Sequence, residues 1–109
     1  PDNSRFYFQD LPQEKHIRYV PNSKHNLAGT DAVDTMTSFY ESILRDKPRP
    51  RFSWSKSADG SIRVRTKDTP VEVKLWQATN PEARDFRVDT IGKAYTATTL
   101  SPSGKGEYV

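Results

Sequence analysis

The sequence predicts an α+β chain in which a helical first part, residues 1–47, is followed by an antiparallel β part, residues 48–109. Three observations predict this order. Between residues 32 and 44, apolar side chains recur at the three- and four-residue spacing of one helix face. From residue 52 onward they recur at every second position, which is the period of a strand. The stretch between the two patterns holds two prolines and three basic residues, so no helix continues through it.

The first thirty residues predict a short helix, a strand and a polar loop. Capping-type and aromatic residues from Asp2 to Asp10 indicate the last turns of a helix that ends near Pro12. This helix is aromatic on several sides, so we expect more protein around it than the chain itself supplies. Lys15–Val20 contains β-branched and aromatic residues and predicts a strand, and Asn22–Thr30 predicts a loop.

The main helix is predicted to begin after Asp31, a residue type favoured at helix N-caps, and to run to about Arg45. Asp34 lies in its first turn, where the helix dipole favours negative charge. The basic, proline-containing connector 46–51 follows the helix and predicts the domain boundary. Seven apolar residues define the buried face that this periodicity predicts: Ala32, Val33, Met36, Phe39, Tyr40, Ile43 and Leu44.

Strand and turn signals alternate over the second part of the chain. Phe52 and Trp54 alternate with serines, and Asp59-Gly60 separates them from the apolar residues around Val64, which predicts a hairpin. Short antiparallel strands with frequent turns indicate an immunoglobulin-like or fibronectin-like β-sandwich, and we expect at least one closing strand to be absent. The further strands are predicted at Val71–Trp76, Phe86–Val88, Tyr95–Leu100 and Glu107–Val109.

Composition excludes several classes of function. The 17 basic and 14 acidic residues are interleaved and leave a net charge of +3, so the chain has no broad basic field for nucleic acid. The absence of cysteine excludes disulfides and thiolate metal sites. No apolar run approaches the length of a membrane span. Pro1 is not a natural start residue, so we expect a removed leader or a cut-out from a longer protein.

Two stretches carry a more specific signal than any short pattern. They are Leu11–Leu27 and the string Leu75-Trp76-Gln77-Ala78-Thr79-Asn80-Pro81, with the following Ala83-Arg84-Asp85-Phe86-Arg87. Together they resemble the PhoPQ-activated pathogenicity-related protein family, which is similar to the α/β-hydrolases. The resemblance spans nearly the whole chain. It implies that residues 1–47 are the C-terminal helix-strand-helix end of an α/β-hydrolase-like domain, followed by an incomplete β-sandwich domain, in a periplasmic or secreted protein.

His25 is the candidate catalytic residue that this resemblance implies. In α/β-hydrolases, a histidine in the loop after the last core strand takes the proton of a serine hydroxyl, and His25 has that place. The serine sits in a Gly-x-Ser-x-Gly elbow, which this sequence lacks. We therefore expect the serine and an orienting aspartate upstream of Pro1, and no activity in the fragment alone. Judged from its neighbours only, a lone histidine in a polar loop is usually solvated or stabilises a turn.

Other chemistry-bearing residues have structural interpretations. We expect His16 to be a paired strand residue, and its spacing from His25, without a matching carboxylate, does not make a metal site. We assign no metal and no cofactor. Trp54 and Trp76 would suit a carbohydrate platform, but we expect them to fill the sandwich core or its interface with the hydrolase domain. Four basic residues fit a solvated linker better than a site for anionic lipid or polysaccharide: Arg45, Lys47, Arg49 and Arg51.

Two functions follow from this sequence. The first is a secreted or periplasmic serine hydrolase with His25 as general base, whose β-domain shapes the rim of the active site. The second is a hydrolase-shaped, non-catalytic binding or signalling protein linked to virulence or stress response. The expected partner in both is the missing N-terminal hydrolase core of the same protein. The edge of the predicted strand Lys15–Val20 is expected to pair with that core or with another copy of the fragment.

Overall fold

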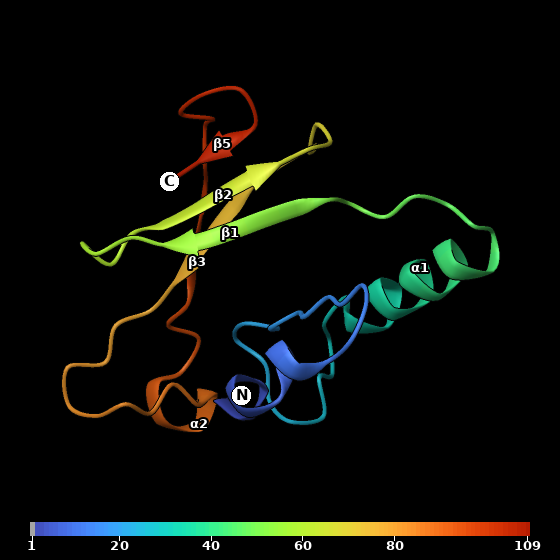
Figure 1. Ribbon diagram of the computed structural model, residues 1–109. Helices are drawn as coiled ribbons and strands as arrows, with labels where there is room; N and C mark the ends of the chain where they lie inside the picture. Colours follow the sequence, from blue (N-terminus) through green and yellow to red (C-terminus); the bar gives the residue numbers. More distant parts are fainter. Residues whose placement is uncertain (1) are drawn as a thin grey trace.

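The structure, a computed structural model, describes residues 2–109 and shows two small sheets above a layer of helices and loops (Figure 1). Helix α1 extends alone to one side of the molecule, and an extended connector returns from its end to the first strand. The elements are, in chain order, η1 Asp2–Phe6, η2 Phe8–Asp10, α1 Ala32–Leu44, β1 Phe52–Lys56, β2 Ile62–Thr66, β3 Lys74–Gln77, α2 Val88–Ile91, β4 Thr96–Thr99 and β5 Glu107–Tyr108.

The prediction of α1 is confirmed. Asp31 is its N-cap residue and Asp34 lies in its first turn, but the Asp31 side chain does not cap the helix. Instead, the Asp31 carboxylate accepts a hydrogen bond of 2.5 Å from the guanidinium of Arg18. The helix ends at Leu44 because Asp46 adopts a positive φ of 48° and Pro48 follows two residues later.

The predictions for the segment before α1 need correction. Residues 2–10 form the two 3₁₀ turns η1 and η2 rather than the end of an α-helix. Lys15–Val20 is not a strand, and the predicted helix-strand-helix order is therefore wrong. The Lys15 ammonium donates to the carbonyl oxygens of Gln9 and Leu11 at 2.7 and 3.0 Å, so this segment is held by η2 and the residues after it. A segment rich in β-branched residues forms a strand only where a neighbouring strand can hydrogen-bond to its backbone. In the described chain no strand lies beside this segment.

The first sheet confirms the predicted hairpin and has the antiparallel order β1-β2-β5. Trp54 pairs with Val64 in the register of β1 and β2. The turn is closed by the amide of Ser57, which donates to the carbonyl of Ser61 at 2.9 Å, and Gly60 supplies the positive φ of 88° that the turn needs. The second sheet pairs β3 with β4, with Leu75 opposite Thr98.

The predicted strand Phe86–Val88 is wrong, because the short helix α2 begins at Val88. The Asp85 carboxylate accepts hydrogen bonds from the Arg87 amide at 3.2 Å and from the Thr90 hydroxyl at 2.9 Å. These bonds fold the backbone into a turn, which competes with extension into a strand. Gly92, with a φ of 64°, ends the helix.

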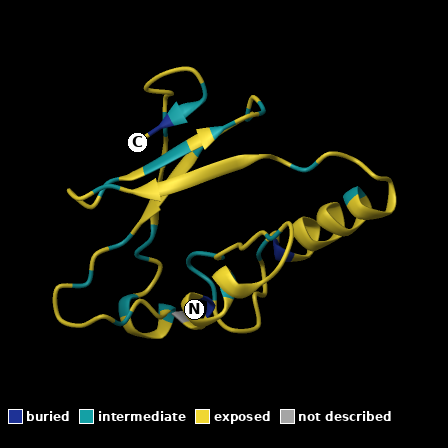
Figure 2. Ribbon diagram, viewed as in Figure 1, coloured by how far each residue is buried: buried dark blue, intermediate teal, exposed yellow. Residues whose placement is uncertain are grey.

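The molecule has very little core. Ala32 and Tyr108 are the only buried hydrophobic residues in the part of the chain that the structure describes, and most of the ribbon is exposed (Figure 2). The accessible surface is 9357 Å², whereas a folded monomer of this mass has about 6,200 Å². The radius of gyration is 15.7 Å, against about 13 Å for a compact domain of this length.

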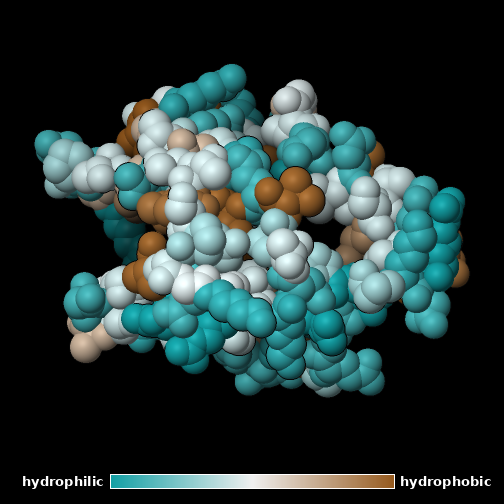
Figure 3. All heavy atoms as spheres, turned by 90° about the horizontal axis from the view of Figure 1, so that it is seen from above, coloured by the Kyte–Doolittle hydropathy of each residue, from teal (hydrophilic) through white to brown (hydrophobic). Residues whose placement is uncertain are grey.

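The two tryptophans do not fill a core within this chain, since Trp54 is 58% exposed and Trp76 is 45% exposed. Space filling shows hydrophobic side chains reaching the surface in several patches between polar ones (Figure 3). The antiparallel character of residues 48–109 is confirmed. The sandwich, its interface with a hydrolase domain and the boundary near residue 47 stay predictions.

Candidate functional site

His25 lies in a loop built from successive tight turns. The Ser23 hydroxyl donates to the carbonyl of Val20 at 2.9 Å, and the Leu27 amide donates to the carbonyl of Lys24 at 3.0 Å, so His25 lies inside the second of these turns. The Thr30 hydroxyl donates to the Leu27 carbonyl at 2.7 Å and closes the path into α1. The polar residues that predicted a loop here thus also fix its shape.

Two long-range contacts anchor this loop to the second half of the chain. The Asn22 side chain accepts a hydrogen bond from the Tyr95 amide at 3.0 Å and donates one to the Tyr95 carbonyl at 2.8 Å. Asn22 has a φ of 56°, which asparagine tolerates better than most residues. Two residues further along, Lys24 forms an ion pair of 2.7 Å with Asp89 in α2, and this hydrogen bond raises the pKa of the Lys24 ammonium.

Sequence reasoning missed these anchors. Asn22 and Tyr95 are 73 residues apart, and nothing in the spacing of either residue indicates the other. The one available signal is the residue type at position 22, because asparagine favours positive-φ turns and its amide matches a backbone N–H and C=O together.

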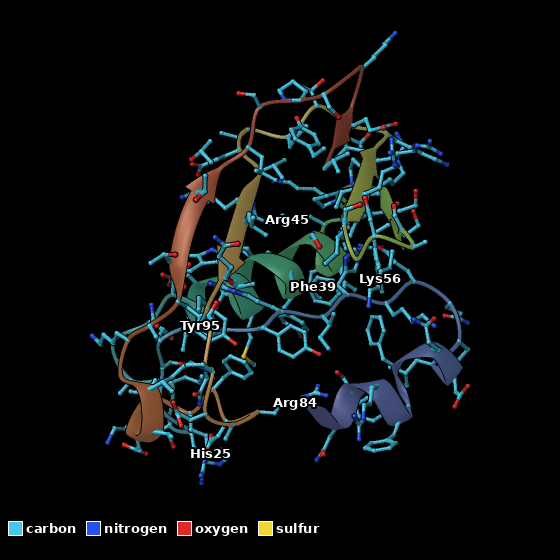
Figure 4. All side chains as sticks on the ribbon, turned by 90° about the vertical axis from the view of Figure 1, so that its left-hand side faces the viewer. His25, Phe39, Arg45, Lys56, Arg84 and Tyr95 are labelled. Carbon is cyan, nitrogen blue, oxygen red and sulfur yellow. The ribbon has the colours of Figure 1, made fainter. Side chains whose placement is uncertain are left out.

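The His25 side chain is exposed and points away from the molecule (Figure 4). Within residues 2–109 it makes no hydrogen bond, ion pair or ring contact. The loop therefore presents an unengaged imidazole to whatever covers this side of the chain. An imidazole nitrogen that makes no hydrogen bond can accept a proton from an approaching group and later return it.

His16 has the carboxylate partner that His25 lacks. Its Nε2 lies 2.8 Å from Oε1 of Glu14, and its ring lies edge-on to Phe39 of α1 with centroids 5.7 Å apart. A second aromatic neighbour is Phe52 of β1, with centroids 6.3 Å apart. The prediction that His16 is a paired strand residue is wrong, because the ring instead joins the segment before α1 to both α1 and β1.

Arg49 completes this cluster from the connector. Its Nε and Nη2 donate to the two carboxylate oxygens of Glu14 at 2.7 and 2.5 Å, and its guanidinium lies 6.0 Å from the centre of the Phe39 ring. The hydrogen bonds from Arg49 and His16 lower the pKa of Glu14 to about 2. We call Glu14, His16, Phe39, Arg49 and Phe52 the connector cluster. Because its carboxylate is already held by arginine, this cluster is a structural contact between four segments.

The other candidates are also engaged in structural contacts. Arg51 forms an ion pair of 2.7 Å with Asp68, and Arg45 lies 3.8 Å from Glu41 one helical turn before it. With Arg49 held by Glu14, the connector thus offers few unpaired cations to an anionic surface. No group of three histidine or carboxylate residues gathers as a metal site in the described chain. Within the same residues, no helix has the length and apolar character needed to cross a bilayer.

Comparison with known proteins places the chain in a family. The model of the family described as "PhoPQ-activated pathogenicity-related protein" matches residues 1–87. "Autocrine proliferation repressor protein A" of Dictyostelium discoideum is 34% identical over an alignment of 104 positions, and the match covers 83% of this chain. The chain spans 21% of the length of that relative. No solved structure matches. The resemblance noted in the two sequence stretches is thereby confirmed, and the chain belongs to the PhoPQ-activated pathogenicity-related protein family.

Proposed function

We propose that this chain is part of a serine hydrolase in which His25 is the general base. The observation that supports this role is an exposed, unengaged imidazole on a loop that is anchored just before His25 by the hydrogen bonds of Asn22 and the ion pair of Lys24. A general base must be free to take up a proton and must be held in one place, and this loop meets both needs. In the reaction, His25 would take the proton of a serine hydroxyl and return it to the leaving group.

The serine and the orienting carboxylate would come from another part of a longer polypeptide. The sequence has no Gly-x-Ser-x-Gly elbow, and the chain spans only 21% of the relative that it matches. The small core supports the same proposal, because a separate domain of this length buries far more apolar surface. Residues 2–109 alone are expected to be inactive, since a base without its nucleophile has nothing to activate.

We also propose that the parent protein works in the periplasm or is secreted. The proposal draws on the family's description as pathogenicity-related and on the relative's name as an autocrine factor, which describes a protein that leaves the cell. Cell fractionation with a tagged parent protein would test it, and recovery in the cytosolic fraction alone would contradict it.

The first test is chemical labelling of the parent protein. We expect a fluorophosphonate probe to label the parent, and we expect His25→Ala to slow that labelling by about 100- to 10,000-fold, the usual contribution of a general base. Asn26→Ser is the matched control, because it changes the neighbouring residue of the same turn while a serine hydroxyl can still accept the hydrogen bond that the Asn26 side chain takes from the Ala28 amide. Equal labelling of the His25→Ala variant and the parent would exclude His25 as the base.

A second candidate function is a hydrolase-shaped protein that binds or signals without catalysis, linked to virulence or stress response. The name of the Dictyostelium relative, a repressor of proliferation, favours this alternative. The same experiment separates the two functions. A parent protein that resists the probe but keeps a growth-repressing effect, with or without His25→Ala, would support the non-catalytic candidate.

A further inference from the structure

One side of α1 is apolar and uncovered. Its four residues follow one another at spacings of three, four and four, so they line a single stripe along the helix. We call them the outer stripe: Val33 is 70% exposed, Met36 70%, Tyr40 61% and Leu44 66%. None of the four carries a charge, so the stripe fits an apolar partner surface rather than a nucleic acid or a charged ligand.

The rest of the chain covers a different side of the same helix. Ala32 is buried at 8% exposure, and Phe39 packs against His16 and Arg49 of the connector cluster. An open groove of about 430 Å³ lies between the helix and the connector. Its lining consists of residues from the helix side away from the outer stripe and from the connector: Asp34, Thr35, Ser38, Phe39, Ser42, Pro48, Arg49 and Pro50. The folded chain therefore leaves the outer stripe exposed on a side of α1 that neither the connector cluster nor the groove covers, and α1 itself extends away from the two sheets (Figure 1).

We infer that the outer stripe docks α1 onto an apolar surface in the remainder of the same polypeptide. The family match, residues 1–87, includes α1, and the relative that resembles this chain is almost five times as long as the region it shares. The accessible surface exceeds that of a compact monomer, as expected if further polypeptide covers part of this chain. This inference rests on one premise of the proposed function, a longer parent, and does not depend on hydrolysis.

A second copy of the chain is a poorer occupant. The four side chains together offer on the order of 450–500 Å². A stable interface between separate molecules needs about 800 Å² from each partner, because association must offset the loss of translational and rotational freedom. A surface on the same polypeptide does not carry that loss, so a stripe of this size suffices for docking within one chain.

Cysteine labelling in the parent protein tests the inference without disturbing the fold. This chain has no cysteine, so Met36→Cys introduces one thiol in the outer stripe, and Ser38→Cys introduces a matched thiol on the far side of α1. We expect a maleimide, followed by mass spectrometry of the α1 peptide, to modify the Met36→Cys variant at least tenfold more slowly than the Ser38→Cys variant. Equal rates would overturn the inference, because the stripe would then be open to solvent.

Dilution and the fluorophosphonate probe separate the remaining outcomes. Protection of the Met36→Cys thiol that persists on hundredfold dilution supports docking within one polypeptide. Protection that disappears on dilution would overturn the inference in favour of a second copy. If the thiol is protected but the parent protein does not react with the fluorophosphonate, the result would contradict the proposed hydrolase activity and support the docking of the outer stripe.

Discussion

At the scale of single residues, Glu14 of the connector cluster makes the protein sensitive to acid. Its contacts with Arg49 and His16 lower the pKa of its carboxyl from 4.5 to about 2 in the folded state. A lowered pKa means that the carboxylate stabilises the fold fully above about pH 4.5, and that this stabilisation is lost as the pH falls towards about 2. We expect Glu14→Gln to melt at a lower temperature than the unmodified protein at pH 6, with the difference vanishing near pH 2.

Circular dichroism melts at pH 6, 4 and 2.5 would measure this effect. Glu82→Gln is the matched control, because it makes the same chemical change at an exposed glutamate whose side chain is not in the connector cluster. A melting difference between Glu14→Gln and the unmodified protein that stays constant from pH 6 to pH 2.5 would show that the carboxylate charge is not the stabilising feature.

The environments of the two histidines could be predicted only in part. The exposure of His25 agrees with the polar loop that its neighbours predict. The environment of His16 was not predictable, because its partners lie up to 36 residues away on α1 and β1. Strand propensity placed His16 in a sheet, but the ring is held by Glu14 and two phenylalanines, which are tertiary contacts that no local pattern encodes.

At the scale of elements, the attachment of β5 to β2 depends on a glycine. Gly106 has a φ of 68°, and a Cβ atom there would lie 2.7 Å from the carbonyl oxygen of Thr66. The same two residues are joined by a hydrogen bond of 2.7 Å from the Thr66 amide to the Gly106 carbonyl. We expect Gly106→Ala to lower the free energy of unfolding by the cost of its left-handed backbone, roughly 1–2 kcal/mol, and by a further 1–3 kcal/mol or so for the clash.

Gly60 provides the control for this prediction. It has a φ of 88° in the β1–β2 turn, but a Cβ atom there would meet nothing within 4 Å. Gly60→Ala should therefore show the backbone cost alone. Urea unfolding of both variants measures the difference, and equal losses would mean that Thr66 gives way to the added methyl group.

The elements that could be predicted are those set by local pattern. Helical periodicity predicted α1, and alternation around Asp59-Gly60 predicted the β1–β2 hairpin. The wrong predictions, Lys15–Val20 and Phe86–Val88, concern short runs of mixed apolar and charged residues whose conformation is decided by their surroundings. The first run lacks a neighbouring strand, and the second is turned by the side chain of Asp85.

At the scale of the whole molecule, the antiparallel β part was predictable and the lack of a core was not. Periodicity shows which face of an element is apolar, but it does not show whether the chain itself covers that face. Met36 and Trp54 both follow the periods that predict burial, yet they are 70% and 58% exposed. The periodicity of these residues and their exposure are consistent with each other if the surface that covers them belongs to a longer polypeptide, as proposed above.

The small core also predicts how residues 1–109 unfold when they are prepared alone. A compact domain absorbs about 0.7 kcal/mol per residue on melting, which amounts to about 75 kcal/mol for a chain of this length. With only Ala32 and Tyr108 buried among its described hydrophobic residues, we expect the isolated chain to show less than about half of that enthalpy, over a broad temperature range.

Differential scanning calorimetry, with sedimentation at the same concentrations, would test this prediction. If the parent protein covers the apolar faces, as proposed above, the segment should melt with its surroundings in a sharp transition. Self-association of the isolated chain would also cover them, but the melting temperature would then rise with concentration, which sedimentation would detect. A sharp transition of about 75 kcal/mol in a monomeric isolated chain would contradict the dependence on a longer polypeptide, because the chain would then fold as an independent domain.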